Sequence, residues 1–331
     1  MRPRGTFALT FAAKLTSWYQ TAKRDLPWRK TSDPYRILVS EIMLQQTRAQ
    51  AVIPYYEKFI ERFPTPADLA QASESDVLHS WSGLGYYQRA RNLQRAASRI
   101  VQAGSFPRDY EAIRALPGVG PYTAAAVGSI AFALRLAVVD GNVLRVIARL
   151  TGDSSDIGSP ATKLRFESEA ARLLGRADPG QFNQAMMELG ATICLPRNPL
   201  CLLCPVSGGC QARLQSRQGE LPVKLKRIDP VRVKTTLLVI EREGKILLWR
   251  RDPASQRLGG FWELPSTEEL PRVKARQTLG SFRHSITNRN YIFTVMTAKL
   301  SGASPGFKWI EPSQLQQLPL STTAKKALAL L

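Results

Sequence analysis

Histidine and cysteine are scarce in this chain of 331 residues, and long apolar runs are missing from it. The two histidines, His79 and His284, lie far apart in the sequence, which excludes a histidine-rich metal site. No stretch of about 18 or more apolar residues occurs, so we expect no transmembrane helix and no membrane partner. The rest of the composition is that of a globular protein, long enough for two domains with a sizeable core.

Acidic residues are also few, at 26 against 46 lysines and arginines, so the formal net charge is +20. An excess this large favours a polyanionic partner, and nucleic acid is the first candidate. A basic protein that is merely soluble is the alternative. The N-terminal stretch 1–15 resembles a signal peptide, but its apolar run is short and Lys14 interrupts it. We therefore expect mature protein in the cytoplasm, associated with the nucleoid if the source is bacterial.

All four cysteines lie in one short segment, with the spacing Cys194-x6-Cys201-x2-Cys204-x5-Cys210. Their clustering in a chain otherwise free of cysteine argues for metal binding rather than disulfides. Four thiolates can converge on one centre, and this ligand count suits either tetrahedral zinc or a four-iron cluster. Four free cysteines in the core are the remaining alternative.

A glycine turn stands at residues 116–120, where Pro117 removes a backbone donor and Gly118 and Gly120 permit close backbone approach. Pro121 suits the first turn of a new helix, whose N-terminal N–H groups are available to an anion. An ordinary corner between two helices would have the same sequence. Asp140 follows twenty residues after Gly120, in the sequence Val-Val-Asp-Gly-Asn, and its presence there favours a functional interpretation of the turn.

Glu41 lies on the apolar stripe of a helix predicted over 35–52, together with Ile37, Leu38 and Leu44. A carboxyl group in an apolar wall has a raised pKa. The alternative is a buried glutamate that pairs with an arginine in the core.

The pattern changes from helical to β along the chain. Helices are predicted up to residue 194, including one over 7–30, and a glycine turn at 83–85 precedes Tyr86 and an arginine-rich helix. This combination suits a phosphate backbone and a stacked base, although a solvated face would look similar. We predict a helical domain over 1–212, a connector over 213–232 and a mixed α/β domain over 233–331. Its strands are expected over 235–240, 246–251, 291–300 and 307–310, with a hairpin turn at Glu243-Gly244 and helices over 313–318 and 322–331.

Together these motifs resemble the helix-hairpin-helix DNA glycosylases, and within them the adenine DNA glycosylase (MutY) family. The glycine turn and the segment 139–146 after it resemble the superfamily, and the cysteine spacing is similar to that of its endonuclease III branch. Three short sequence motifs are similar to the adenine glycosylase family, at residues 26–29, 39–47 and 83–87. It implies a mainly α glycosylase domain with an iron–sulfur loop at 194–210, and a C-terminal α/β domain similar to Nudix proteins. The glutamate-rich helix of Nudix hydrolases is missing after the turn at 259–265, so we do not expect pyrophosphate hydrolysis.

The family resemblance also implies an activity. It implies a monomeric, monofunctional enzyme that excises adenine mispaired with 8-oxoguanine or guanine in double-stranded DNA, with a four-iron–four-sulfur (4Fe–4S) cluster on Cys194, Cys201, Cys204 and Cys210. Tyr122 stands where bifunctional lyases of the superfamily have a lysine, and without that amine no Schiff base can form. An endonuclease III-like lyase and a non-catalytic DNA-binding module with a zinc staple are the alternatives.

The resemblance further implies a role for each matching residue. Glu41 donates a proton to adenine and activates water, while Asp140, ionised near the positive end of the hairpin, stabilises the sugar cation. The other expected site residues support catalysis (Tyr122, Asn142), line the adenine pocket (Trp28, Arg29, Glu188), fill the base stack (Gln46, Tyr86), contact the DNA backbone (Gly118, Gly120) or read 8-oxoguanine (Thr287, Asn288). The last two stand where the family usually has part of a Phe-Ser-His sequence.

Overall fold

The computed structural model describes residues 4–225, 231–252, 255, 258–286, 289–300 and 305–331. It separates into two compact units, one formed by residues 1–70 and 95–227 and the other by 71–94 and 228–331. Residues 71–94 thus group with the C-terminal part of the chain, rather than with the helices before and after them. The domain boundaries at 212 and 233 stay a prediction.

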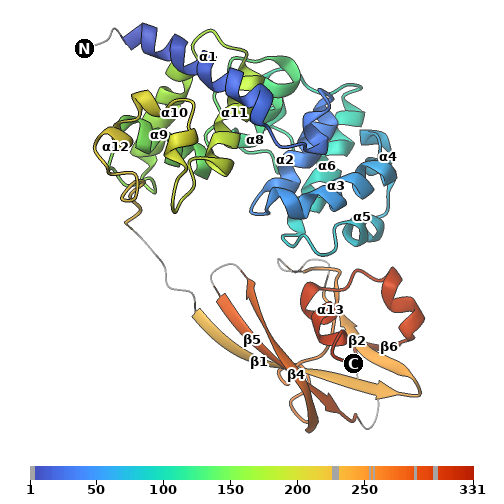
Figure 1. Cartoon of the computed structure of the whole chain (residues 1–331). Coiled ribbons are helices and arrows are strands. Elements are labelled where there is room, and N and C mark those ends of the chain that lie inside the picture. Colours follow the sequence, from blue (N-terminus) through green and yellow to red (C-terminus); the bar gives the residue numbers. More distant parts are fainter. Residues whose placement is uncertain (1–3, 226–230, 253–254, 256–257, 287–288, 301–304) are drawn as a thin grey trace. The chain divides into compact units, whose positions relative to one another are not determined.

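The helical part of the chain runs from α1 to α12 (Figure 1). Its elements are α1 (Arg4–Ala22), η1 (Pro27–Arg29), α2 (Pro34–Leu44), α3 (Ala49–Arg62), α4 (Pro66–Gln71), α5 (Glu74–Ser80), α6 (Gln88–Gln102), α7 (Tyr110–Arg114), α8 (Pro121–Phe132), α9 (Gly141–Thr151), α10 (Pro160–Leu174), α11 (Pro179–Thr192), η2 (Cys201–Leu203), η3 (Ser207–Gly209) and α12 (Gln211–Leu214).

Two of the predicted helices are shorter than expected. The helix predicted over 7–30 ends at Ala22, and Pro27, which has no N–H to donate, begins a separate short 3-10 turn. The helix predicted over 35–52 begins as expected after Asp33, whose carboxylate accepts the Tyr35 N–H at 2.8 Å. It is interrupted where Gln46 adopts a φ of 58°, so α2 and α3 are separate helices.

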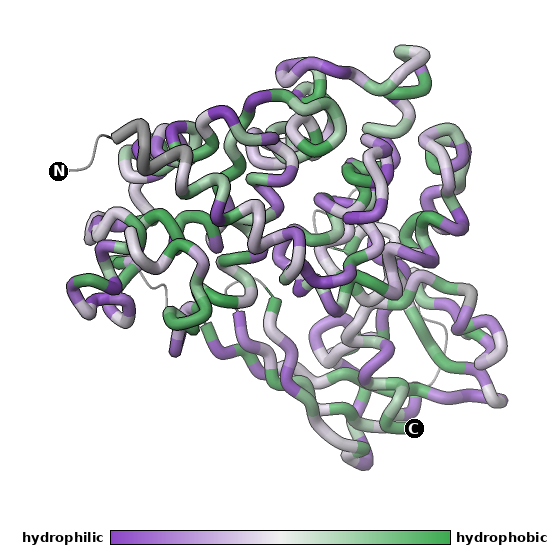
Figure 2. The backbone as a smooth tube through the Cα atoms, turned by 45° about the horizontal axis from the view of Figure 1, so that its top comes forward, coloured by the Kyte–Doolittle hydropathy of each residue, from purple (hydrophilic) through white to green (hydrophobic). Residues whose placement is uncertain are grey.

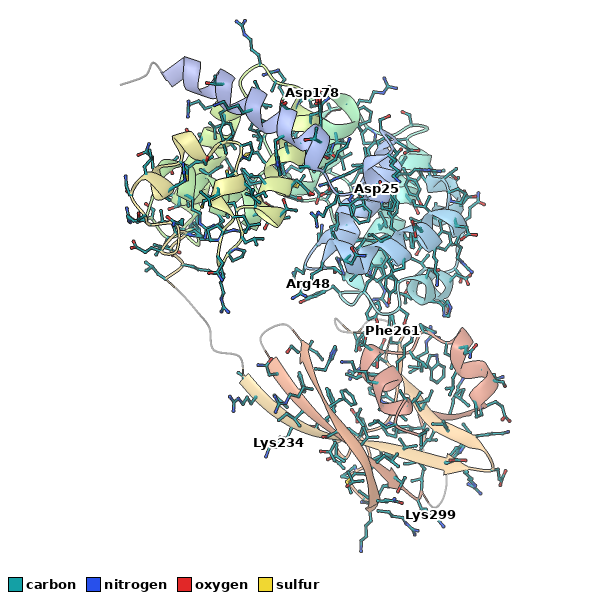
Figure 3. The ribbon with its side chains drawn as sticks, in the orientation of Figure 1. Asp25, Arg48, Asp178, Lys234, Phe261 and Lys299 are labelled. Atoms are coloured by element: carbon teal, nitrogen blue, oxygen red, sulfur yellow. The ribbon has the colours of Figure 1, made fainter. Side chains whose placement is uncertain are left out.

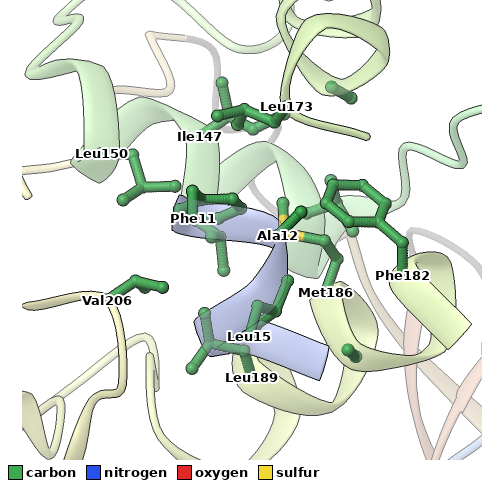
Figure 4. Close-up of a cluster of buried hydrophobic side chains, with 14 of the residues drawn as sticks. Phe11, Ala12, Leu15, Ile147, Leu150, Leu173, Phe182, Met186, Leu189 and Val206 are labelled. Carbon is green, nitrogen blue, oxygen red and sulfur yellow. The ribbon is translucent and has the colours of Figure 1, made fainter. Parts of the chain in front are cut away.

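A buried cluster of apolar side chains fixes α9 against α1 and α11 (Figure 4). Phe11 on α1 meets Phe182 on α11 edge to face, with ring centroids 6.4 Å apart. The other labelled members are Ala12, Leu15, Ile147, Leu150, Leu173, Met186, Leu189 and Val206. Because α9 begins directly after Asp140 and α11 carries Glu188, this core sets the relative positions of two candidate site residues.

The C-terminal part forms a mixed sheet in the order β3-β2-β1-β5-β4, with β6 paired to β2. Its strands are β1 (Val231–Arg242), β2 (Lys245–Arg250), β3 (Trp262–Glu263), β4 (Ala275–Ile286), β5 (Arg289–Ala298) and β6 (Phe307–Ile310). The turn predicted at Glu243-Gly244 is confirmed, since both residues have positive φ, at 52° and 74°. β1 and β5 run parallel, with Val231 opposite Arg289.

β4 was not predicted, and one of the predicted helices is of a different type. β4 carries register shifts between Ala275 and Gly280, so the simple alternation that marks a strand is broken. The helix predicted over 313–318 is a 3-10 helix, η4 (Pro312–Gln317), whereas α13 (Thr322–Leu328) is confirmed.

Apolar and polar residues alternate in short stretches along the chain (Figure 2). Among the described residues, no helix is long and apolar enough to cross a membrane. Basic side chains such as Arg48, Lys234 and Lys299 are exposed (Figure 3), as the charge excess predicts.

The core around α1 gives a first testable prediction. Leu15 is 0% exposed, and Leu15→Ala removes its side chain from the cluster that holds α9 and α11. We expect the free energy of unfolding to fall by about 2–5 kcal/mol in urea titrations. The matched control is Leu164→Ala on α10, because Leu164 is 64% exposed; its effect should stay within about 0.5 kcal/mol. Equal effects of the two substitutions would contradict this account of the core.

Candidate active site

The glycine turn joins α7 to α8 and has the predicted hairpin form. Gly118 has a φ of 77°, a conformation that favours glycine, and Val119 closes the turn by donating its N–H to the Leu116 carbonyl at 3.1 Å. Gly120 caps α8 with extended backbone, and a Cβ added there would meet no atom within 4 Å. As far as the described residues show, neither packing nor backbone conformation therefore requires glycine at residue 120.

Glu41 on α2 is buried, as predicted, with 5% of its surface exposed. Its Oε2 atom has no hydrogen-bond partner among the described residues. Burial raises the pKa of this carboxyl from 4.5 to about 7, hydrogen bonding with Tyr122 holds the rise down, and the negative charge of Asp140 adds to it. The alternative of a salt-bridged core glutamate does not fit, since no ion pair of Glu41 is found in the described part of the chain.

Tyr122 lies at the start of α8 and interacts with Glu41. Its hydroxyl donates a hydrogen bond to the Met187 Sδ at 3.3 Å. Burial, followed by the nearby negative charges of Glu41 and Asp140, raises the pKa of the Tyr122 phenol well above its ordinary value. The phenol therefore stays protonated and can donate to a carboxyl or to a bound base.

Asp140 is the N-cap of α9. Its Oδ1 accepts the Val143 N–H at 2.7 Å, and its Oδ2 accepts the Asn142 amide at 3.0 Å. The helix whose positive end Asp140 caps is α9. Burial raises the Asp140 pKa, while these hydrogen bonds lower it. Both carboxyl pKa values are raised, but only Asp140 has several donors that stabilise its anion.

Asn142 connects this carboxylate to the segment that carries the cysteines. Its Oδ1 accepts a hydrogen bond from Arg145 Nη2 at 2.8 Å, and Arg145 Nε donates to the Cys194 carbonyl at 2.8 Å. Gly190 on α11 lies so close that an added Cβ would be 2.6 Å from the Cβ of Asn142. Arg145 and Gly190 were not among the predicted site residues. An arginine one turn after the N-cap and a glycine inside a helix were the signals available.

Glu188 on α11 is fully buried between two arginines. Arg24 donates to Glu188 Oε1 through its backbone N–H at 3.0 Å and through Nε at 2.9 Å, and Arg29 Nη2 donates to Oε2 at 2.7 Å. Burial alone would raise the pKa of this carboxyl, but the hydrogen bonds from Arg24 and Arg29 hold it at about 2. Glu188 and Arg29, both expected to line the adenine pocket, are paired with each other, and Arg24 is a second partner of Glu188. Trp28 is buried edge to face against Tyr56, with ring centroids 5.4 Å apart.

The four cysteines are free and half-buried. Burial raises the pKa of the Cys204 thiol to about 11, and the other three cysteines add to the rise, so the four groups lie near one another. Arg149 lies beside them, with Nη1 at 3.3 Å from Cys194 Sγ, and its carbonyl accepts from Cys210 Sγ at 3.3 Å. Within the described ranges, however, no group of three or more His, Cys, Asp or Glu residues is arranged to hold a metal ion.

The remaining expected site residues lie in turns. Gln46 is exposed in the turn between α2 and α3 and has a φ of 58°. Tyr86 is 45% exposed and has a φ of 48°, which is unusual for a residue with a side chain. Thr287 and Asn288 fall outside the described residues. The strands before and after them are paired as far as Ile286 and Arg289.

Comparison with known proteins agrees with this arrangement. The profile of the HhH-GPD superfamily of base excision DNA repair proteins matches residues 39–172, and that of the NUDIX domain matches residues 235–330. A solved thermostable thymine-DNA glycosylase is similar in structure, with a TM-score of 0.56 and 32% identity over 63% of this chain and 98% of that one. A trapped endonuclease III–DNA covalent intermediate, with a TM-score of 0.54 and 23% identity over 65% and 99% of the two chains, shows the same fold. The fold and the site thus define a base excision repair protein with a helix-hairpin-helix.

Curated relatives narrow this class. The adenine DNA glycosylase of Homo sapiens is 34% identical over 96% of this chain and 73% of its own length. The adenine DNA glycosylase of Mycobacterium tuberculosis (strain ATCC 25618 / H37Rv) is 45% identical over 58% of this chain and 64% of its own length. The chain belongs to the adenine DNA glycosylase family. It is an enzyme that acts on N-glycosyl bonds. The adenine glycosylase relatives favour this activity over that of an endonuclease III-like lyase and over a zinc-stapled binding module.

The buried Glu41 carboxyl predicts a pH-dependent stability. Its pKa is about 7 in the folded protein against 4.5 for the free group, so the folded state binds the proton more tightly. The stabilisation of the folded state by this bound proton is fully present below pH 4.5 and is lost as the pH rises through 7. Relative to the parent, Glu41→Gln should therefore gain up to about 3 kcal/mol in free energy of unfolding between pH 4.5 and pH 8, measured by urea titration.

The control for this measurement is Glu111→Gln, which removes a carboxylate from an exposed position on α7. Its difference from the parent should not grow with pH in the same way. If the Glu41→Gln difference is the same at both pH values, the carboxyl is not held protonated by its surroundings.

Proposed function

We propose that this chain acts as a monomer that hydrolyses the N-glycosidic bond of adenine mispaired with 8-oxoguanine or guanine in double-stranded DNA. The observation that carries the proposal is the pairing of two unlike carboxyls. Glu41 is buried with a bare Oε2 and a pKa of about 7, while the neighbouring Asp140 accepts hydrogen bonds on both oxygens. Such a pair supplies the acid and the counter-ion that cleavage of a glycosidic bond requires.

Glu41 is the proton donor in this proposal. A pKa of about 7 leaves a substantial fraction of the acid form at neutral pH, and the free Oε2 can meet a nitrogen of the extruded adenine. Protonation turns adenine into a better leaving group. The resulting carboxylate can then take a proton from the water that attacks the sugar, and Tyr122, which interacts with Glu41, keeps it oriented.

Asp140 stabilises the positive charge that develops on the sugar. Its anion is held in place by Val143 N–H and by Asn142, and Asn142 is itself fixed by Arg145. No reorganisation is then needed when charge develops in the transition state. Because Tyr122 offers no amine, the enzyme leaves an abasic site without cutting the strand.

The other residues bind the substrate. Glu188 and Arg29, held by Arg24, form a polar wall for the extruded base, and the buried Trp28 supplies an apolar part of the pocket. Gly118 and Gly120 let a DNA phosphate approach the start of α8. Gln46 and Tyr86 are exposed and fill the base stack, and Thr287 and Asn288 read 8-oxoguanine.

We further propose that the four cysteines hold a 4Fe–4S cluster. Four half-buried thiols in one loop supply the donor chemistry, and the buried Arg149 guanidinium beside Cys194 suits a thiolate. Such a cluster would supply a rigid, charged centre that fixes the loop, since base hydrolysis transfers no electron. The protein's own contribution is the set of hydrogen bonds from Arg145 and Arg149 to this loop.

An excision assay tests the proposed function. On duplexes with a single adenine opposite 8-oxoguanine, guanine or thymine, the parent should release adenine from the first two only. The adenine strand should break only after alkali treatment. Breakage without alkali, or release of oxidised pyrimidines alone, would contradict the proposal. Asp140→Asn and Glu41→Gln should each lower the single-turnover rate by at least about 100-fold with retained DNA binding, and the rate of the parent should fall as the pH rises through 7.

Metal content tests the cluster. The purified protein should be brown and contain about four irons per chain. Cys204→Ser should lose iron, whereas Leu202→Ser, which changes a residue that is 90% exposed in the same loop, should keep it. A colourless protein with one zinc would show that the loop is a zinc staple instead.

A further inference from the structure

Arg89, near the start of α6, is a buried arginine with an unusual set of neighbours. Only 8% of its surface is exposed. Its guanidinium lies over the ring of Trp81 and over the ring of Tyr86, at 5.5 Å from each centroid. Its Nη2 also donates to the carbonyls of Leu84 and Gly85, at 3.1 and 3.2 Å. All these residues belong to the same compact unit.

These contacts all converge on the turn that presents Tyr86. Gly83, Gly85 and Tyr86 have positive φ angles of 116°, 70° and 48°. The Trp81 indole donates to the Gly85 carbonyl at 3.2 Å, and the Arg89 N–H donates to the Tyr86 carbonyl at 2.9 Å. A tyrosine in the left-handed region keeps that conformation only where its surroundings enforce it. Arg89 contacts this turn in three ways: its backbone N–H binds the Tyr86 carbonyl, its Nη2 binds the carbonyls of Leu84 and Gly85, and its guanidinium lies over the Tyr86 ring. It is therefore well placed to enforce the conformation of Tyr86.

The contacts also require arginine in particular. A planar guanidinium can lie between two aromatic rings and still donate in its plane to two carbonyls. A lysine ammonium is a compact charge and cannot do both. Burial lowers the pKa of Arg89 to about 10, which leaves it charged at neutral pH. The guanidinium faces the two rings and the turn carbonyls rather than open solvent, so it is not available as a simple phosphate contact.

We propose that Arg89 is a positioning residue that holds Tyr86 as a rigid, exposed aromatic ring for stacking against a base beside the mispair. This inference rests on the proposed function, in which Tyr86 enters the base stack. Arg89 acts through Tyr86 and does not touch the reacting atoms. Pre-ordering of the ring lowers the entropic cost of inserting it into DNA, so the effect falls on substrate binding.

The first experiment needs no DNA. Hydrogen–deuterium exchange is followed in peptides that cover 82–89 in the parent and in the variants Arg89→Met, Arg89→Lys and Arg95→Met. Arg95 is the matched control, because it is exposed on the same helix and its replacement removes the same charge. We expect exchange in this peptide to be about tenfold faster in Arg89→Met and faster also in Arg89→Lys, with Arg95→Met like the parent. Parent-like protection in Arg89→Met would overturn the proposal.

The second experiment asks whether Arg89 works through Tyr86. Dissociation constants for an A:8-oxoguanine duplex are measured in the Glu41→Gln background, so that no base is removed. We expect Arg89→Met and Tyr86→Ala each to bind about tenfold more weakly than Arg95→Met, and the double variant no more weakly than Tyr86→Ala alone. Arg89→Lys should resemble Arg89→Met, although it keeps the charge. Additive losses, or full binding by Arg89→Lys, would show that Arg89 acts only as a cation.

Spectroscopy supplies a readout that simple destabilisation would not change. With 2-aminopurine beside the 8-oxoguanine, binding of the parent should raise fluorescence as the base unstacks, and Tyr86→Ala and Arg89→Met should both lose this rise at saturating protein. A normal rise with Arg89→Met overturns the positioning role. Circular dichroism identifies any variant that fails to fold. If Arg89→Met is such a variant, Arg89→Lys is compared with the parent in its place.

The two proposals fail in different ways. If the parent excises no adenine, the proposed function is wrong, while the exchange experiment still decides whether Arg89 orders the turn. If the parent excises adenine and Arg89→Met matches Arg95→Met in exchange, binding and fluorescence, the function stands and the role of Arg89 is wrong.

Discussion

The close approach of α9 and α11 is the contact on which the arrangement around Asp140 depends. The two helices can meet at Asn142 only because residue 190 has no side chain; a methyl group there would be 2.6 Å from the Cβ of Asn142. The approach lets Arg145 reach from Asn142 to the carbonyls of Gly190 and Cys194. The apolar cluster of α1, α9, α10 and α11 supplies the free energy that holds it. One glycine therefore sets the geometry of Asn142, and through it that of Asp140.

Electrostatic differences between Glu188, Asp140 and Glu41 follow from the hydrogen bonds that each carboxyl accepts. Glu188 is buried, accepts from two arginines and stays ionised, while the partly buried Asp140 accepts from the N-terminus of α9 and from an amide. Glu41 is buried and has an Oε2 atom without a hydrogen-bond partner among the described residues. Desolvation acts on all three, so the number and charge of donors decide the outcome. Elements of one compact unit thus give three carboxyls three different electrostatic environments.

Much of this arrangement could be predicted from the sequence because it depends on local chemistry. The apolar stripe around Glu41, the hairpin glycines and the cysteine spacing are short-range patterns, and the structure confirms the burial of Glu41 and the hairpin. The contacts of Arg24 and Arg145 could not be predicted, because Glu188 and the Cys194 carbonyl, which they bind, lie on segments far away in the sequence. The strand β4 was missed for a different reason: its bulges break the alternation on which strand prediction relies.

The parallel pairing of β1 with β5 determines which end of the sheet is tethered. Val231 lies opposite Arg289, and β4 finishes at Ile286, so the connector joins the sheet at the end from which the segment carrying Thr287 and Asn288 departs. An antiparallel arrangement would have put the connector and residues 287–288 at opposite ends. With both at one end, a change in connector length acts on the end of the sheet that adjoins residues 287–288.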